Sequence, residues 1–137
     1  MTTLNQLLYK PRKQKIKIQT KKALNKCPQK LAICNKIRIM APKKPNSAQR
    51  QVARVKIVST NKFLTVYISG EGHTLQQYSN VLIRGGRVRD LPGIKYKIIR
   101  GNRDAKATTD NTRNQRRSKF GIPKIKEKIN IKITTKK

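Results

Sequence analysis

Two basic segments of the chain contain the side chains best suited to bind an anion. The first, Pro42–Ser47, places two lysines between two prolines and ends in an asparagine and a serine. Each proline fixes its own φ at about −65° and disfavours helix in the residue before it. The sequence therefore predicts a stiff, extended loop over 41–47 that is partly ordered before it binds. Its lysines would supply positive charge, and its last two residues would supply short hydrogen-bonding groups.

The second segment, Leu82–Gly101, surrounds one carboxylate with basic residues. Asp90 lies close in sequence to four cations, Arg84, Arg87, Arg89 and Lys95, and a proline follows at position 92. A carboxylate among arginines can neutralise one of them, or it can orient one towards a ligand. The residues leave both roles for Asp90 open.

Catalytic and metal-binding groups are scarce. His73 is the only histidine, and no serine or cysteine nucleophile lies at a catalytic spacing from it. The segment Gly70–His73, GEGH, lacks the third glycine of a dinucleotide-binding loop and is expected to form a turn. Cys27 and Cys34 have no nearby histidine, so they fall short of a four-ligand zinc site and are expected to be free thiols. We therefore predict no enzymatic activity, no cofactor and no metal site.

The net charge indicates the class of partner. The 137 residues include 35 Lys and Arg against 5 Asp and Glu, a formal net charge of +30. So large an excess cannot be neutralised within the chain, and it points to a nucleic acid. No run approaches the roughly 18 apolar residues that cross a membrane, so no membrane partner is expected.

The few aromatic residues bear on how a nucleic acid would be bound. Only Phe63, Tyr67 and Tyr96 lie where they could stack on bases from strands, and core packing is the expected use of at least two. Phosphate contacts and backbone shape are therefore expected to dominate, as is usual for structured RNA.

The elements that must position these residues are short strands. Runs with β-branched residues at alternate positions occur at Ile33–Met40, Gln51–Val58, Phe63–Ser69, Asn80–Arg84, Arg87–Arg89 and Lys95–Arg100. Several short strands without a long helix predict a mainly β fold, and the length fits a five-stranded barrel of the oligonucleotide/oligosaccharide-binding type (OB-fold) over 31–101.

Basic extensions are expected on both sides of this barrel. Residues 1–30 are basic and lack a buried face, apart from a short helix suggested by LNQLL, so they are expected to form an extended arm that follows phosphates. Residues 102–137 form a basic C-terminal extension. The alternation in KIKEKINIKI, residues 124–133, fits an added edge strand and a tail ordered on a partner equally well.

Two long segments carry a resemblance to a known family. APKKPNSAQRQVARVKI and GEGHTLQQYSNVLIRGGRVRDLPGIKYKIIRG resemble the signature segments of the universal small-subunit ribosomal protein twelve family, and the resemblance runs from LNQLLYKPRK to RRSKFG. It implies an OB-fold barrel with a long N-terminal arm threaded through the small subunit, bound to small-subunit rRNA and neighbouring proteins. It also implies a decoding-centre position near the A-site tRNA and mRNA, and a role in translational accuracy. The residues implied to face the decoding site are Lys43, Lys44, Pro45, Asn46, Ser47, Arg87, Arg89, Asp90, Leu91, Pro92 and Gly93.

Three further expectations follow from the resemblance. The matching aspartate can carry a methylthio group in bacterial relatives, which makes Asp90 a candidate for modification. The start of the chain matches the start of the family, so no cleaved targeting peptide is expected and the chain would be made where it works. Heavy use of Ile, Lys and Asn, together with KCPQK, favours an organelle-encoded mitochondrial member over a plastid or bacterial one.

Two alternatives remain, one within the class of RNA-binding modules and one among enzymes. A free OB-fold RNA-binding protein, such as an initiation factor or a cold-shock-like protein, would show more aromatic residues on its strands. A small RNA-processing enzyme would need acid–base groups that the sequence lacks.

Overall fold

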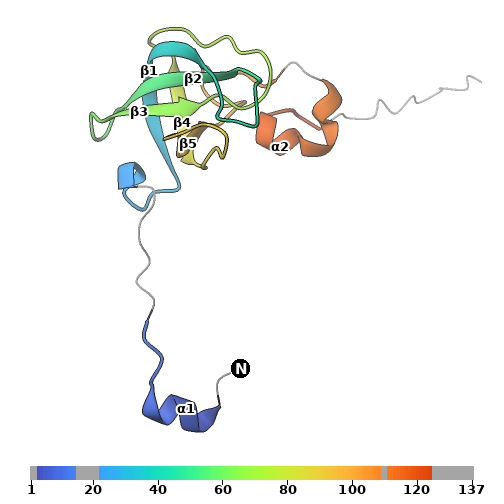
Figure 1. Ribbon diagram of the computed structural model, residues 1–137. Helices are drawn as coiled ribbons and strands as arrows, with labels where there is room; N and C mark the ends of the chain where they lie inside the picture. The colour runs from blue at the N-terminus through green and yellow to red at the C-terminus, as the bar shows by residue number, and fades with distance from the viewer. Residues whose placement is uncertain (1–2, 15–21, 109–110, 125–137) are drawn as a thin grey trace, which may run out of the picture.

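The computed structural model describes residues 3–14, 22–108 and 111–124 and is built around a β-barrel (Figure 1). Its strands are β1 (Gln29–Met40), β2 (Arg50–Ile57), β3 (Phe63–Tyr67), β4 (Asn80–Gly85) and β5 (Tyr96–Ile98). They close in the order β1-β2-β3-β5-β4, with β3 and β5 parallel and the other neighbours antiparallel. This confirms the predicted mainly β fold with a five-stranded barrel of the OB type.

The alternation of apolar and charged residues explains why these segments form strands. In β2, Val55 and Ile57 are fully buried while Arg54 and Lys56 are exposed. Because side chains on a strand point alternately to opposite faces, this pattern turns one face inward and leaves the cations outside. The long strand β1 pairs with both β2 and β4, and its register against β2 shifts between Cys34 and Lys36. Such an irregularity bends a strand and helps a small sheet to close.

Two apolar clusters fill the barrel. The largest fully buried side chains of the main cluster come from all the strands and the segments beside them: Ile57, Ile68, Ile83, Ile98, Val55, Val66, Val81 and Cys34. The smaller cluster consists of Val52, Val88, Leu91 and Ile94, with Met40 and Tyr67 packed against it. This second cluster holds the loop between β4 and β5 against the ends of β1, β2 and β3.

The barrel extends further towards the N-terminus than predicted. β1 begins at Gln29, four residues before the expected Ile33. A 3-10 helix, η1 (Lys22–Leu24), buries Ala23 and Leu24 in the main cluster, and the backbone N–H of Ala23 donates to the hydroxyl of Tyr96 at 3.3 Å. The expectation that residues 1–30 have no buried face is therefore wrong for this part, because two apolar residues in a row suffice to cap the barrel without any periodic pattern.

The predicted strand at Arg87–Arg89 is wrong. Gly86 donates its backbone N–H to Lys95 and Val88 donates to Ile94, at 3.0 and 3.2 Å, so the segment pairs with the chain that leads into β5. The pairing stops there because the chain bends after Val88, and Gly93 adopts a φ of +77° that favours glycine.

Short helices lie outside the barrel. The helix expected in LNQLL is confirmed as α1 (Leu4–Tyr9), but Leu4 and Leu8 are 78% and 74% exposed, so its apolar side chains do not join a core. Near the C-terminus, η2 (Asn111–Arg116) leads into α2 (Arg117–Phe120). Almost all of KIKEKINIKI lies outside the described residues. Within the described ranges, no helix is both long and apolar enough to cross a bilayer.

Candidate nucleic-acid interface

The two basic segments singled out in the sequence meet at one end of the barrel. Lys43, Lys44, Pro45 and Asn46 line a shallow pocket of about 370 Å³ together with Arg89 and Asp90. The backbone N–H of Lys43 donates to the carbonyl of Asp90 at 2.9 Å and ties the two loops together. The fold therefore brings together six of the residues implied to face the decoding site. Ser47, Arg87, Pro92 and Gly93 are exposed on the same two loops but do not line this pocket.

The first loop is a tight turn. The backbone N–H of Asn46 donates to the carbonyl of Lys43 at 3.2 Å, and the Lys44–Pro45 peptide bond is cis. A cis proline at the third position defines a type VI turn. The expectation of an extended loop over 41–47 is therefore wrong at Lys44 and Pro45, where the chain turns, because proline and asparagine suit a turn as well as an extended segment. The side chains of Lys43, Lys44, Pro45 and Asn46 are all exposed at the tip of this turn.

The second loop is held by buried apolar side chains. Val88, Leu91 and Ile94 are 8%, 2% and 2% exposed, and all belong to the smaller core cluster. Arg87 directly precedes the first anchor, Arg89, Pro92 and Gly93 lie between the anchors, and all four are exposed. Leu91, which the resemblance placed among the residues facing the decoding site, is therefore a buried anchor that positions its neighbours.

Asp90 pairs with an arginine that the sequence did not suggest. Its Oδ2 lies 3.2 Å from Nε of Arg50, the first residue of β2, and the two side chains are 18% and 36% exposed. None of the four cations expected near Asp90 forms an ion pair with it. Arg50 lies 40 positions away along the chain, and no local pattern could have identified it, since the barrel closure alone places it beside this loop.

The exposed cations of the two loops are not neutralised within the described part of the chain. Lys43, Lys44, Arg87 and Arg89 form no ion pair there, and the nearby carboxylate of Asp90 is engaged by Arg50. The surface can therefore offer its positive charge to an anion, and the backbone tie and the buried anchors hold that charge in place.

A buried arginine fixes the turn that was expected at Gly70–His73. The guanidinium of Arg100, 4% exposed, donates to the carbonyls of Ser69, Gly72, Lys106 and Ala107 at 2.7 to 3.3 Å. Burial lowers the pKa of Arg100 from its ordinary value. The turn itself is confirmed, with φ values of +86° at Gly70 and +58° at Gly72. Burial lowers the pKa of the half-buried His73, and the charge of Arg100 lowers it further, so both effects favour the neutral ring.

The three strand aromatics have different surroundings. Tyr96 lies in the main cluster and Tyr67 packs against the smaller one, which confirms that at least two serve the core. Phe63 is 50% exposed, and the guanidinium of Arg54 lies over its ring at 5.4 Å from the centroid. The described strands thus offer little aromatic surface for stacking bases.

Residues 17–128 match the family model described as Ribosomal protein S12/S23. The chain belongs to this family. The match contains the whole barrel, both basic loops and α2. As an S12/S23 member the chain is a small-subunit ribosomal protein. Members of this family are structural rather than enzymatic and associate with small-subunit rRNA and other ribosomal proteins.

Proposed function

We propose that this S12/S23 protein binds small-subunit rRNA at the decoding centre through the loops Lys43–Ser47 and Arg87–Gly93, and thereby tunes translational accuracy. In this proposal the A-site tRNA and the mRNA are affected indirectly, through the rRNA that the loops hold. The basic residues on the N-terminal side of η1 and on the C-terminal side of β5 would contact rRNA outside the decoding centre.

The observation that carries this proposal is the meeting of the two loops. Their exposed cations lie on either side of one shallow pocket. The hydrogen bond from the backbone N–H of Lys43 to the carbonyl of Asp90 holds the two loops in a fixed position relative to each other. Phosphate groups in folded RNA are closely spaced, so a fixed pair of cationic loops can contact neighbouring phosphates and hold one RNA geometry against another. Discrimination between near-equal codon pairings needs this kind of fixed geometry.

The alternative of a free single-strand binder has less support. Such proteins usually stack bases on strand aromatics. Of the candidates on the strands, only Phe63 is at least half exposed, and its ring already carries Arg54.

Directed cleavage of rRNA tests the position of the loops. In a Cys27→Ser background, which removes the exposed thiol, Ser47→Cys would carry a tethered iron chelate in reconstituted small subunits. Ser59→Cys is the matched control, since it is exposed after β2 whereas Ser47 precedes β2, and the two lie at opposite ends of that strand. Cleavage at the rRNA of the decoding region from Ser47→Cys, and elsewhere from Ser59→Cys, is expected. If subunits with Ser47→Cys assemble but show no cleavage in the decoding region, the proposal is rejected.

A mitochondrial ribosome is the proposed location. The support is compositional, namely the heavy use of Ile, Lys and Asn typical of an AT-rich genome and the KCPQK segment. Mass spectrometry of ribosomes purified from separated organelles tests it, and recovery of the chain only from plastid or bacterial-type ribosomes would reject it.

Asp90 is the proposed site of a methylthio group. Its carboxylate is bound by Arg50 and 18% of its side chain is exposed. Peptide mass spectrometry of ribosome-derived protein decides the matter, because an unmodified Asp90 peptide would reject the proposal.

A further inference from the structure

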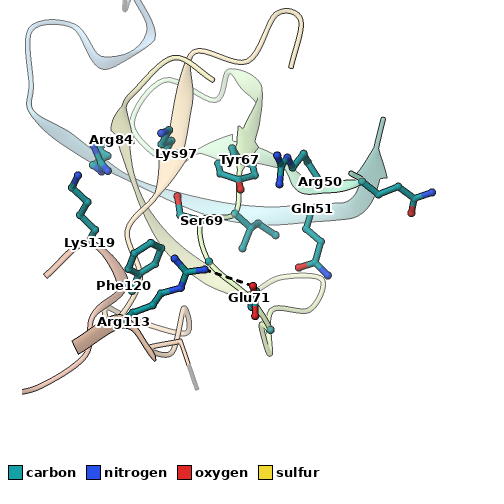
Figure 2. Close-up of a pocket in the computed structure, with 14 residues that line it drawn as sticks. Arg50, Gln51, Tyr67, Ser69, Glu71, Arg84, Lys97, Arg113, Lys119 and Phe120 are labelled. Carbon is teal, nitrogen blue, oxygen red and sulfur yellow. Dashed lines mark ion pairs between the residues drawn. The ribbon is translucent and has the colours of Figure 1, made fainter. Parts of the chain in front are cut away.

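A basic cleft lies between the barrel and the C-terminal helices. It has a volume of about 510 Å³, with β2, β3, β4 and β5 on one side and η2 and α2 on the other (Figure 2). Five cations line it: Arg50, Arg84, Lys97, Arg113 and Lys119. The one carboxylate in the lining, Glu71, lies 3.6 Å from Arg113.

Two of these cations face each other directly across the sheet. Arg84 of β4 and Lys97 of β5 are register partners in an antiparallel pair, so their side chains leave the same face of the sheet. Like charges placed directly opposite each other on neighbouring strands destabilise a sheet. Neither residue forms an ion pair within the described part of the chain. No acidic side chain of the described residues therefore offsets their repulsion.

A third cation approaches the same place from the other wall. Lys119 of α2 extends towards Arg84 at the end of the cleft away from Glu71 and Arg113 (Figure 2). Lys119 has no acidic partner among the described residues. Because Glu71 offsets the charge of Arg113 at the far end, the favoured position for a phosphate is among Arg84, Lys97 and Lys119.

The packing holds these cations in place. The stem of Lys97 lies against Gly86, where an added Cβ would come 3.1 Å from its Cδ. The carbonyl of Phe120 accepts hydrogen bonds from both the backbone N–H and the hydroxyl of Thr108, at 3.1 and 3.2 Å. Gly121 packs so closely on Gly101 that an added Cβ would lie 2.5 Å from its Cα. These contacts attach α2 firmly to the barrel, and they thereby hold the backbone of Lys119 at the edge of the cleft.

The remaining lining suits a nucleotide rather than a bare anion. Tyr67 packs against the smaller core cluster, with Nζ of Lys97 6.0 Å from its ring centroid, and it lines the cleft, where its hydroxyl can exchange a hydrogen bond with a base. Gln49 and Gln51 bring amides that can both donate to and accept from a base edge.

We infer that this cleft binds one unpaired nucleotide of an RNA strand, with its phosphate among Arg84, Lys97 and Lys119 and its base towards Tyr67 and the two glutamine amides. The site is separate from the pocket formed by the two basic loops. The inference rests on the proposed RNA-binding function, and its failure can be told apart from the failure of that function.

The test compares two double variants of the full chain that lose the same charge. Arg84→Gln with Lys97→Met removes the facing cations and keeps the stem on Gly86, while Lys56→Gln with Lys62→Met removes two exposed cations elsewhere. Affinity for a short single-stranded RNA is measured by fluorescence anisotropy over a range of salt concentrations. The cleft variant is expected to bind at least about tenfold more weakly than the control, since a charge-assisted contact is lost. The slope of log affinity against log salt concentration should be shallower for the cleft variant than for the control by about one unit, because a phosphate contact is lost.

Thermal unfolding of the free chains provides a second readout. The cleft variant should melt no lower than the control, because the like-charge pair is relieved. Loss of RNA affinity without loss of stability separates a binding role from a structural one. If the barrel is disrupted instead, Lys119→Gln, at an exposed position on α2, compared with the exposed Lys106→Gln, gives the same comparison without touching a strand.

Each remaining outcome has a definite meaning. A wild-type chain that binds no short single-stranded RNA would overturn this inference alone, because the proposed function concerns folded rRNA and is tested separately by directed cleavage in assembled subunits. Equal weakening of both double variants would leave the function standing and overturn the cleft. Inorganic phosphate or AMP that displaces the RNA at equal concentration would identify a free phosphate ligand, and an acidic peptide that binds better than RNA would identify a protein partner; either result overturns the inference.

Discussion

Nε of Arg50 lies 3.2 Å from Oδ2 of Asp90 and joins the first residue of β2 to the loop that follows β4. Asp90 also accepts the backbone N–H of Lys43 through its carbonyl, so one residue connects the strand and both basic loops. Arg50 in addition lines the cleft beside α2. Arg50 therefore links the two proposed RNA-binding surfaces, because it lines the cleft and pairs with Asp90 of the loop pocket.

We expect a small but measurable coupling between Arg50 and Asp90. A double-mutant cycle with Arg50→Met and Asp90→Asn should give a coupling free energy of about 0.5 kcal/mol, because Arg50 is 36% exposed and solvent screens the pair. Denaturant unfolding of the four proteins measures it. A coupling of zero within error would mean that the pair has no energetic role in holding the loop.

Arg100 should be far more important for stability than the arginines at the surface. Arg100→Met removes the donor from four part-buried hydrogen bonds to carbonyl groups, and each lost partner is costly, so we expect destabilisation by about 3 kcal/mol. Arg100→Lys should recover part of this, since an ammonium cannot reach all four carbonyls at once. Arg103→Met, at an exposed position, is the matched control and should change the free energy of unfolding by less than about 0.5 kcal/mol. Equal effects at positions 100 and 103 would contradict the role of the buried guanidinium.

The two thiols should react at very different rates. Burial raises the pKa of Cys34 to about 11, with the negative charge of Asp104 adding to the effect, while Cys27 is exposed. Since the thiolate is the reactive form, iodoacetamide at pH 8 should label Cys27 and leave Cys34 untouched in the folded chain. Peptide mass spectrometry after timed labelling measures both sites, with urea-unfolded protein as the control in which both react. Labelling of Cys34 at the rate of Cys27 in folded protein would contradict its burial.

The same shift fixes the sign of a pH effect on stability. The folded state favours the neutral thiol of Cys34, so this contribution is complete below the ordinary pKa of 9.0 and is lost as the pH rises towards 11. A Cys34→Ala chain should lose less stability than the wild type between these two pH values. Unfolding curves at pH 8 and pH 10.5 measure the difference, and parallel losses in the two chains would exclude Cys34 as its source.

The alternation of side chains was enough to predict most of the barrel. β2 was predicted within one residue at each end, because Val55 and Ile57 alternate with Arg54 and Lys56 over a full strand. The segment at Arg87–Arg89 shows the same alternation, but its apolar residue anchors a loop, and three residues are too few to distinguish the two cases. The alternation of apolar and charged residues predicts which side chains are buried, but over so short a segment it does not show whether the segment is a strand or a loop.

Partners that are distant in sequence could not be predicted. Asp90 had four cations close by in the chain, yet barrel closure placed Arg50 against it. Arg100 resembles every other arginine of a chain with 35 basic residues, and only the fold encloses it with carbonyl groups. Arg84 and Lys97 face each other only because of the register between β4 and β5, and this register cannot be predicted from the local sequence of either strand.

Lys43 provides the sharpest test of the decoding role. Lys43→Arg keeps the charge but replaces a compact ammonium by a planar fork, which is not a conservative change at a tight RNA contact. The side chain is exposed, and the Lys43 backbone already pairs with Asp90 and Asn46, so the fold and subunit assembly should be unaffected. One displaced charge-assisted hydrogen bond is worth about 1.5–3 kcal/mol, roughly a ten- to hundredfold effect on a competing equilibrium. We therefore expect ribosomes with Lys43→Arg to accept near-cognate codons, or to respond to streptomycin, at a changed frequency.

Two controls isolate the position of the lysine. Lys62→Arg makes the same chemical change in the exposed loop at the other end of β2, and it should leave misreading at the wild-type frequency. Arg54→Ala removes a cation from the barrel wall and should alter assembly or nothing, because this residue lies far along β2 from the two loops. A misreading reporter, with sedimentation to confirm assembly, measures all three. If Lys43→Arg ribosomes assemble normally and read near-cognate codons at the wild-type frequency with and without the drug, the turn at Lys43–Asn46 does not set accuracy and its charge serves only to bind the subunit.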